Sequence, residues 1–276
     1  MTKWEQAAEL LIPLPERYLD LRSTLDCGQA FRWRRQKDGW WNAVVRGHAL
    51  RLRREGGAVR AQVYPRHADP VGLLASYLRL DVDLEALYGA FAGADPWINR
   101  AVAAYPGLRV LGQEPVETLL SYVCSTANSV PRISRSVEQM SRRYGRLVAT
   151  LDGVDYHAFP APAALAAAPP QELWNDCGLG WRGTNLQRVA RALMALPEGW
   201  PEPLRPLPYP EARAQLMALP GIGPKIADCV CLFALGKDEA VPVDTHIWAL
   251  AREIFGLQVP TRTLTPATYE AVSRLF

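Results

Sequence analysis

The spacing of hydrophobic residues changes near Pro65, and this change limits the fold more than any other feature of the sequence. From about residue 28 to residue 64, apolar and polar residues alternate, as in the run WWNAVVRG at 40–47, and glycine-containing turns separate such runs. After Pro65 the apolar residues recur with the period of a helix, in segments that begin with pairs such as Asp95-Pro96. The pattern predicts an α+β chain, in which an antiparallel meander is followed by an all-α region.

The length of the chain allows two packed domains, because 276 residues with 49% apolar content can bury a large core. We expect residues 1–110 to form an N-terminal antiparallel β-sheet domain with flanking helices. We expect residues 111–276 to form a helical domain. Within it, the proline-rich segment 197–210 is predicted to be an irregular linker between helical regions.

Composition narrows the class of protein. No apolar stretch approaches the roughly 20 residues that a membrane span needs, and the N-terminus is acidic, unlike a secretory signal. We therefore expect a cytoplasmic protein of bacterial type, active at the nucleoid, with no membrane partner. The five cysteines form no C-x-x-C pair and the four histidines are scattered, which argues against a zinc site or an iron–sulfur cluster. The net charge of +3 is too small to indicate nucleic-acid binding by itself.

The segment LMALPGIGPKIADCVCLFALG at 216–236 is the most informative part of the sequence. It predicts a helix end, a Pro-Gly-x-Gly hairpin and a second apolar helix. Gly221 and Gly223 allow a tight turn, and the free amides of the following helix start suit a phosphate whatever the base sequence. Lys225 is one of only four lysines in an arginine-rich chain. A lysine kept in such a chain indicates a site that needs an amine able to lose its proton.

The hairpin resembles that of the helix-hairpin-helix DNA glycosylases, whose motif L-P-G-[IV]-G-x-[KQ]-x-A is matched at 219–227. The resemblance implies that Lys225 is an amine nucleophile that attacks C1′ of deoxyribose and forms a Schiff base. In Val-Asp-Thr-His at 243–246, it implies that Asp244 stabilises positive charge at C1′ and that His246 contacts the DNA backbone. A helix N-cap is an alternative for Asp244 that can hold at the same time. The alternative for Lys225 is a surface lysine that contacts a phosphate. The alternative for His246 is an ordinary histidine in the first turn of a helix.

The run CGQAFRW at 27–33 is similar to the G-Q-[SA]-F-R-W signature of the 8-oxoguanine glycosylases, whose N-terminal domain is a TBP-like β-sheet domain. The resemblance implies that the Gly28 carbonyl accepts the N7 hydrogen that 8-oxoguanine has and guanine lacks. It also puts Gln29, Phe31 and Cys229 among the substrate-binding residues. A plain turn glycine is the alternative for Gly28.

The segment STANSVPR at 125–132 is similar to the part of the same family that crosses the minor groove of DNA. Asn128 is the candidate to fill the gap left by the flipped nucleotide, and Arg132 is the candidate to bind the cytosine opposite the lesion. The family usually has three asparagines here, whereas this chain has Ala127 at the first position. The departure affects the expected selectivity for the opposite base.

The turn GLGWR at 178–182 resembles a family turn in which an aromatic wedges beside that cytosine and an arginine binds it. Trp181 and Arg182 are the corresponding residues, with Trp in place of Tyr. The alternative for Trp181 is an ordinary core residue, and the alternative for Arg182 is an ordinary surface charge. The family also closes its base pocket with a Y-A-G-W-A-Q-like run, which does not occur before Phe276. Cys229 is therefore the candidate for the opposite wall, and a shortened chain is expected to bind the base more weakly.

Together these features imply a bifunctional enzyme that removes 8-oxoguanine opposite cytosine from duplex DNA and nicks the strand by β-elimination. The alternatives are a monofunctional or broader-specificity glycosylase of the same superfamily, or a non-catalytic module that binds the DNA backbone. We expect a monomer whose partner is double-stranded DNA containing 8-oxoguanine:C. No cofactor is required by this chemistry. The resemblance adds a structural monovalent cation bound by the backbone carbonyls of Met217, Leu219 and Ile222.

Overall fold

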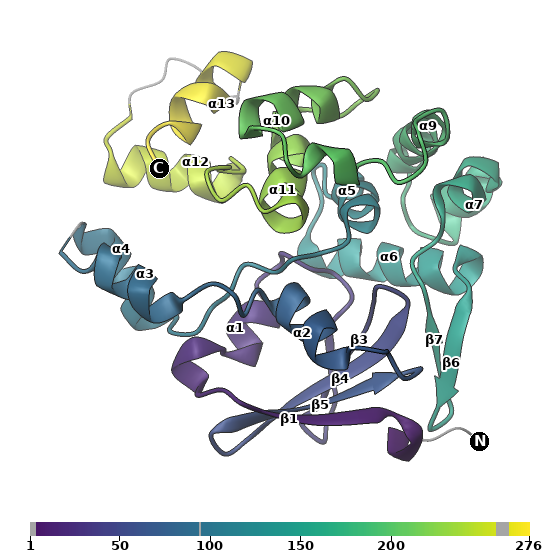
Figure 1. The fold of residues 1–276 in the computed structure, drawn as a ribbon. Helices are drawn as coiled ribbons and strands as arrows, with labels where there is room; N and C mark the ends of the chain where they lie inside the picture. Colours follow the sequence, from purple (N-terminus) through teal and green to yellow (C-terminus); the bar gives the residue numbers. More distant parts are fainter. Residues whose placement is uncertain (1–3, 94, 258–264) are drawn as a thin grey trace.

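The computed structural model describes residues 4–93, 95–257 and 265–276, and it shows an antiparallel sheet below a helical domain (Figure 1). The five-stranded sheet has the order β1-β5-β4-β3-β2, in which each neighbouring pair is antiparallel. Its strands are β1 (Ala8–Pro13), β2 (Arg34–Arg35), β3 (Trp41–Val45), β4 (His48–Glu55) and β5 (Ala58–Tyr64). A separate hairpin consists of β6 (Leu147–Leu151) and β7 (Val154–His157).

Helices make up most of the rest of the described chain. Those of the N-terminal half are η1 (Trp4–Gln6), η2 (Glu16–Tyr18), α1 (Leu21–Leu25), α2 (Pro70–Leu78), α3 (Leu84–Phe91) and α4 (Pro96–Ala104). Those of the C-terminal half are α5 (Pro115–Val123), α6 (Val130–Tyr144), α7 (Pro162–Ala167), α8 (Pro170–Asn175), α9 (Arg182–Met194), η3 (Glu202–Leu204), α10 (Tyr209–Met217), α11 (Pro224–Leu235), α12 (Thr245–Ile254) and α13 (Pro266–Ser273).

One face of the sheet packs against α1 and α2, and this packing forms the core of the N-terminal half (Figure 1). Leu50 of β4 lies opposite Val63 of β5, and both are fully buried together with Leu74 and Leu78 of α2. The alternation in the sequence places these strand side chains on the same face, and their burial is the main stabilising term. The expected α+β class with an N-terminal antiparallel sheet is confirmed.

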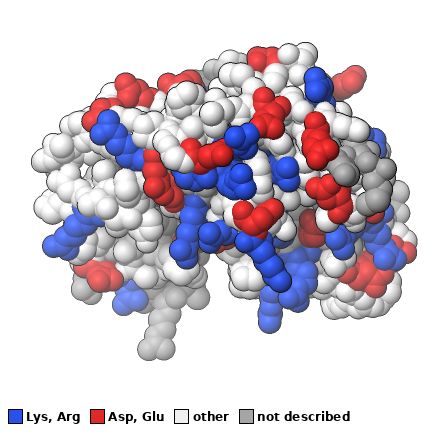
Figure 2. Space-filling view, turned by 90° about the horizontal axis from the view of Figure 1, so that it is seen from below, with Lys and Arg blue, Asp and Glu red and all other residues white. Residues whose placement is uncertain are grey.

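The opposite face of the sheet carries charged side chains that pair with one another. Arg60 of β5 forms ion pairs with Glu9 of β1 and Glu55 of β4, and the guanidinium of Arg51 lies over the rings of Trp4 and Trp40. Figure 2, which views the molecule from below the sheet, shows basic and acidic side chains intermixed on this side. The charges of these paired side chains therefore partly neutralise one another.

The expectation of an all-α region after Pro65 is wrong in one place, because β6 and β7 form a hairpin there. Their turn is Asp152-Gly153, where both residues have positive φ, +50° and +80°, as a two-residue hairpin turn requires. The hairpin packs on the sheet through Leu151, next to Val44. The pair Asp152-Gly153 is typical of a hairpin turn, but it lies between long segments whose hydrophobic pattern is helical. Strand β1 also lies outside the meander expected from residue 28 onward.

The helical half has its own larger core, to which α5, α6, α9, α10 and α11 contribute. Polar contacts join it to the N-terminal half. The guanidinium of Arg34 donates to the carbonyl of Ser134 on α6 at 3.0 Å, and the guanidinium of Arg79 forms an ion pair with Asp238 at 2.6 Å. The two halves therefore present residues to a shared site. In the described part of the chain, no helix combines the length and apolarity needed to cross a bilayer.

Candidate active site

The hairpin between α10 and α11 has the geometry that its glycines predict. Gly221 has φ of +77°, and a Cβ atom there would lie 2.2 Å from Oδ1 of Asn185. Gly223 is the N-cap residue of α11; it has extended backbone, and a Cβ there would meet open space. Gly221 is thus required by the turn, whereas Gly223 leaves the helix N-terminus uncovered. The first-turn amides of α11 have no partner within the helix and form an anion-binding end.

Lys225 lies in the first turn of α11 and points toward α5. Its Nζ is 3.5 Å from Oγ of Ser125 and 5.9 Å from the ring centroid of Tyr122. The side chain is half-buried rather than directed into bulk solvent. The amine therefore lies against Tyr122 of α5 and Ser125, which follows the end of that helix.

Asp244 is the N-cap residue of α12. Its Oδ1 accepts hydrogen bonds from the amides of His246 at 2.8 Å and Ile247 at 3.0 Å. Both bonds use one oxygen, so within the described residues Oδ2 remains available to act on a ligand. Amide donors stabilise the charged carboxylate. The capping role that the sequence left as an alternative is thus present, and it is compatible with a catalytic role.

Cys229 lies one turn beyond Lys225 on α11, and the charges of Lys225 and Asp244 both act on its thiol. Burial is the main cause that raises the pKa of its thiol to about 12; the charge of Lys225 lowers this pKa and that of Asp244 raises it. Both charges therefore act on the same sulfur, which is only 1% exposed. At neutral pH Cys229 is an uncharged thiol, suited to contact a base by packing.

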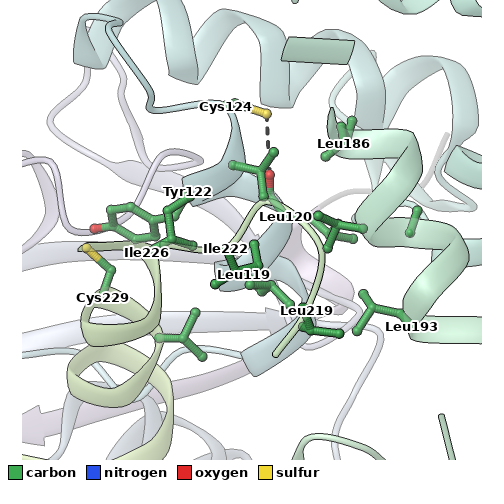
Figure 3. Close-up of a cluster of buried hydrophobic side chains, with 14 of the residues drawn as sticks. Leu119, Leu120, Tyr122, Cys124, Leu186, Leu193, Leu219, Ile222, Ile226 and Cys229 are labelled. Carbon is green, nitrogen blue, oxygen red and sulfur yellow. Dashed lines mark hydrogen bonds between the residues drawn. The ribbon is translucent and has the colours of Figure 1, made fainter. Parts of the chain in front are cut away.

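Gly28 approaches this cluster from the N-terminal half. The Tyr122 hydroxyl lies 3.4 Å from the Gly28 carbonyl oxygen and 3.3 Å from that of Gln29. Figure 3 shows the same hydroxyl beside the sulfur of Cys229, at the edge of the buried cluster. Gly28 has φ of +88°, and a Cβ there would lie 3.0 Å from Cγ2 of Val130. The structure therefore brings Gly28, Cys229 and Lys225 around one tyrosine.

Gln29 and Phe31 occupy supporting places behind Gly28. The side-chain amide of Gln29 donates to the carbonyls of Thr24 and Arg109, each at 2.8 Å, and its Oε1 accepts from the amide of Leu111 at 2.9 Å. Both polar atoms of the Gln29 side chain are thus hydrogen-bonded to backbone groups. Phe31 is 5% exposed and packs edge-on against Tyr122 at 5.1 Å. These two side chains hold Gly28 in place rather than face a substrate.

The candidates for contact with the DNA strand opposite the lesion lie at or just before the starts of α6 and α9. Arg182 donates to the carbonyls of Thr126 and Ala127, both at 2.6 Å, so it props the loop that contains Asn128. The Asn128 amide itself donates to the Cys124 carbonyl at 3.0 Å. In this arrangement both side chains fix the loop, where the sequence suggested contact with DNA.

Two other candidates in this region have exposed side chains that a ligand can contact. Arg132 is exposed in the first turn of α6, and Trp181 is 52% exposed with the Arg182 guanidinium 4.7 Å from its ring. An exposed tryptophan stacked on an arginine offers a flat surface to a base.

The last group of candidates lies around the hairpin. His246 is exposed in the first turn of α12. Among the three residues expected to supply carbonyls to a cation, the Leu219 carbonyl already accepts a hydrogen bond from the amide of Ile222 at 3.2 Å, and the Met217 side chain is 38% exposed. In the described residues, no three His, Cys, Asp or Glu side chains are grouped as metal ligands.

Two residues of the site, Tyr122 and Ser125, were not among the candidates from the sequence. Tyr122 lies within an apolar helical run, so it is typical of a core residue, and it is indeed 5% exposed and stacked on Phe233. Ser125 follows the end of α5 and has no distinguishing neighbour. Only the packing of α5 against α11 reveals that both face Lys225. A tyrosine hydroxyl in a core helix, which needs a polar partner, was the one available signal.

Comparisons with known proteins agree with this geometry. Residues 11–119 match the family described as 8-oxoguanine DNA glycosylase, N-terminal domain, and residues 120–274 match the helix-hairpin-helix superfamily of base excision DNA repair proteins. An N-glycosylase/DNA lyase of Arabidopsis thaliana is 32% identical over 267 residues, which are 94% of this chain and 72% of the relative. An N-glycosylase/DNA lyase of Saccharomyces cerevisiae is 35% identical over 192 residues, which are 65% of this chain and 50% of the relative.

Among solved structures, an 8-oxoguanine glycosylase/lyase of Clostridium acetobutylicum, in complex with double-stranded DNA that has cytosine opposite 8-oxoguanine, is similar with a TM-score of 0.82. The identity is 25%, and the match covers 94% of this chain and 87% of the other. The similarity therefore extends across both halves of the fold.

Proposed function

Because this chain belongs to the 8-oxoguanine DNA glycosylase family of the helix-hairpin-helix superfamily, we propose that it removes 8-oxoguanine opposite cytosine from duplex DNA and then cleaves the abasic strand. The enzyme is a bifunctional DNA glycosylase and AP lyase. The observation that carries the proposal is the grouping of an amine, Lys225, with the Gly28 carbonyl around Tyr122. In this proposal the amine is the nucleophile, and the carbonyl oxygen accepts the hydrogen bond that distinguishes 8-oxoguanine from guanine.

The chemistry follows from the positions of Lys225 and Asp244. The neutral amine of Lys225 attacks C1′ as the C1′–N9 bond breaks, and the electron pair leaves with the base, which takes up a proton. The Asp244 carboxylate stabilises positive charge on the sugar. The sugar ring then opens to an imine, loss of a C2′ proton expels the 3′ phosphate, and water releases the amine. None of these steps requires an external oxidant or reductant, so the reaction needs no redox cofactor.

The direct test of this function is a single-turnover excision assay on duplexes that differ in one base pair. We expect the fastest release from 8-oxoguanine:C and slower release when adenine, guanine or thymine stands opposite. Duplexes with an oxidised pyrimidine or an alkylated purine separate the alternative of a broader-specificity glycosylase. Excision without any strand cleavage on all of them would instead favour a monofunctional enzyme, and binding without excision a backbone-binding module.

Base choice is expected to depend on the backbone of Gly28. Gly28→Ala introduces a Cβ 3.0 Å from Val130 at a φ of +88°, so the carbonyl has to move. We expect the preference for 8-oxoguanine over guanine to fall by about 5- to 150-fold, the range that corresponds to one lost buried hydrogen bond. The measurement is the ratio of excision rates on the two duplexes.

Gly39→Ala is the matched control for this prediction, since Gly39 has a nearly equal φ of +85° in a turn of the sheet domain. It should cost similar backbone strain with no change in the ratio. An unchanged ratio in Gly28→Ala would remove the carbonyl from base recognition.

Several narrower assignments are part of the proposal. Arg132, Trp181 and His246 are proposed to contact DNA, supported by their exposure beside the site. A monovalent cation bound by hairpin carbonyls is also proposed. The Leu219 carbonyl accepts a hydrogen bond from the Ile222 amide within the turn, so a cation would share this oxygen. A monomeric enzyme, a division of the chain near residue 110 and a cytoplasmic location are likewise proposed. Light scattering, limited proteolysis and imaging of a fluorescent fusion test these three.

A further inference from the structure

Asp228 is a buried charged residue for which the proposed chemistry has no direct use. It lies three residues after Lys225 on α11 and is completely buried. Its Oδ1 accepts hydrogen bonds from the Tyr209 hydroxyl at 2.8 Å and from Nε of Arg213 at 2.7 Å, both on α10. Its Oδ2 accepts one from the Tyr269 hydroxyl of α13 at 2.6 Å. A buried carboxylate is stable only when it is paired and hydrogen-bonded, so this well-satisfied network is rigid.

Tyr269 extends the network toward the catalytic carboxylate. Because its hydroxyl proton is directed to Asp228, its oxygen can accept, and it does so from the amide of Val243 at 3.1 Å. Burial and the Asp228 hydrogen bond raise the pKa of Tyr269 well above its ordinary value, so the hydroxyl keeps its proton. Val243 is 1% exposed and immediately precedes Asp244. Two hydrogen bonds of the Tyr269 hydroxyl therefore connect Asp228 on α11 to the backbone next to Asp244.

Among the described residues, the buried apolar side chains around Asp244 are not part of the large core. Val243, Ala251, Tyr269 and Val272 form a small buried cluster of their own, separate from the large core that contains α11. Helices α12 and α13 thus pack on each other, as Figure 1 also shows at the top of the molecule. Polar contacts to α10 and α11 join this pair to the large core, including an ion pair between Arg213 and Glu270 at 2.6 Å.

We propose that Asp228 and Tyr269 are positioning residues, which fix Asp244 relative to the helix that carries Lys225. The inference rests on the proposed excision reaction, in which both groups act on one C1′ atom. Misplacement of a reacting group by about 1 Å can cost about 100-fold in rate, even when the altered residue is far from the chemistry. A rigid hydrogen-bonded path from α11 to Val243 prevents that displacement.

Two tyrosine variants test the proposal because they remove matched hydroxyl groups from one carboxylate. Tyr269→Phe removes a donor to Asp228 and the acceptor of the Val243 amide, whereas Tyr209→Phe removes only a donor to Asp228. We expect Tyr209→Phe to lower Tm by roughly 2–4 °C and Tyr269→Phe to lower it further, because Tyr269→Phe removes two hydrogen bonds and Tyr209→Phe removes one. We expect Tyr269→Phe to slow single-turnover excision by about 10- to 100-fold with DNA affinity unchanged. Tyr209→Phe should stay near the wild-type rate.

A double variant separates positioning from a general loss of stability. If Tyr269 acts through Asp244, then Tyr269→Phe should slow the reaction little further in an Asp244→Asn background. Equal rate losses in the two tyrosine variants, a wild-type rate in Tyr269→Phe, or fully multiplicative losses in the double variant would each overturn the proposal. The wild-type enzyme in the same assay reports on the proposed function itself, so the two failures are distinguishable.

Discussion

Replacing Lys225 by Gln is expected to reduce single-turnover excision of 8-oxoguanine by at least about 10³-fold, the scale of loss when a covalent nucleophile is removed. The substituted side chain is half-buried and has similar length, so folding and DNA affinity should be retained. Among the described residues, the Nζ atom has a long contact with Ser125, 3.5 Å, and a distant one with the Tyr122 ring, 5.9 Å, so little stability is lost with it. The loss should therefore appear in the rate constant and not in the dissociation constant for the duplex.

Lys37→Gln is the matched control, because Lys37 is an exposed lysine in a turn of the sheet domain. It removes the same charge without touching the site, and its excision rate should equal that of the wild type. If Lys225→Gln retained a rate within about tenfold of the wild type, another group would have to act as the nucleophile.

Replacing Asp244 by Asn should lower the excision rate by about 10²- to 10⁴-fold, the contribution typical of an acid–base or charge-stabilising group. Asn is as good an N-cap as Asp, so the bonds to the amides of His246 and Ile247 can persist. The variant thus removes the charge and keeps the helix start. Tm should change little, and the loss should lie in the rate at saturating enzyme.

The chain offers a matched control for this variant in Asp95. It caps α4 in the same way, with Oδ1 accepting from the amides of Trp97 at 2.7 Å and Ile98 at 3.2 Å. Asp95→Asn should change neither the rate nor Tm by a measurable amount. If Asp244→Asn behaved like Asp95→Asn, then capping would be the whole role of Asp244.

The parts of the site that the sequence predicted are those in which local chemistry fixes the backbone conformation. Gly221 must have positive φ, and it does. Lys225 lies in the first turn of α11, as the motif predicts, and Asp244 caps the next helix. The alternation between 40 and 64 gave the sheet and its buried face, because period-2 side chains can share one face only in a strand.

The parts that the sequence did not predict depend on partners distant along the chain. Gln29 was expected at the substrate, but the carbonyl of Arg109 and the amide of Leu111, some 80 residues away, occupy its side chain. Arg182 likewise supports a loop 55 residues earlier. Tyr122 has a pattern typical of a core helix until α11 is packed against it. In each case a residue type indicates that a polar partner is needed, and only the tertiary structure identifies that partner.

Borohydride trapping followed by peptide mapping shows directly whether the amine of Lys225 forms a covalent bond to deoxyribose. The enzyme incubated with 8-oxoguanine:C duplex and sodium borohydride is expected to give one protein–DNA adduct, located by mass spectrometry on Lys225. An adduct on another lysine or on the N-terminal amine, or base release with no adduct, would contradict it.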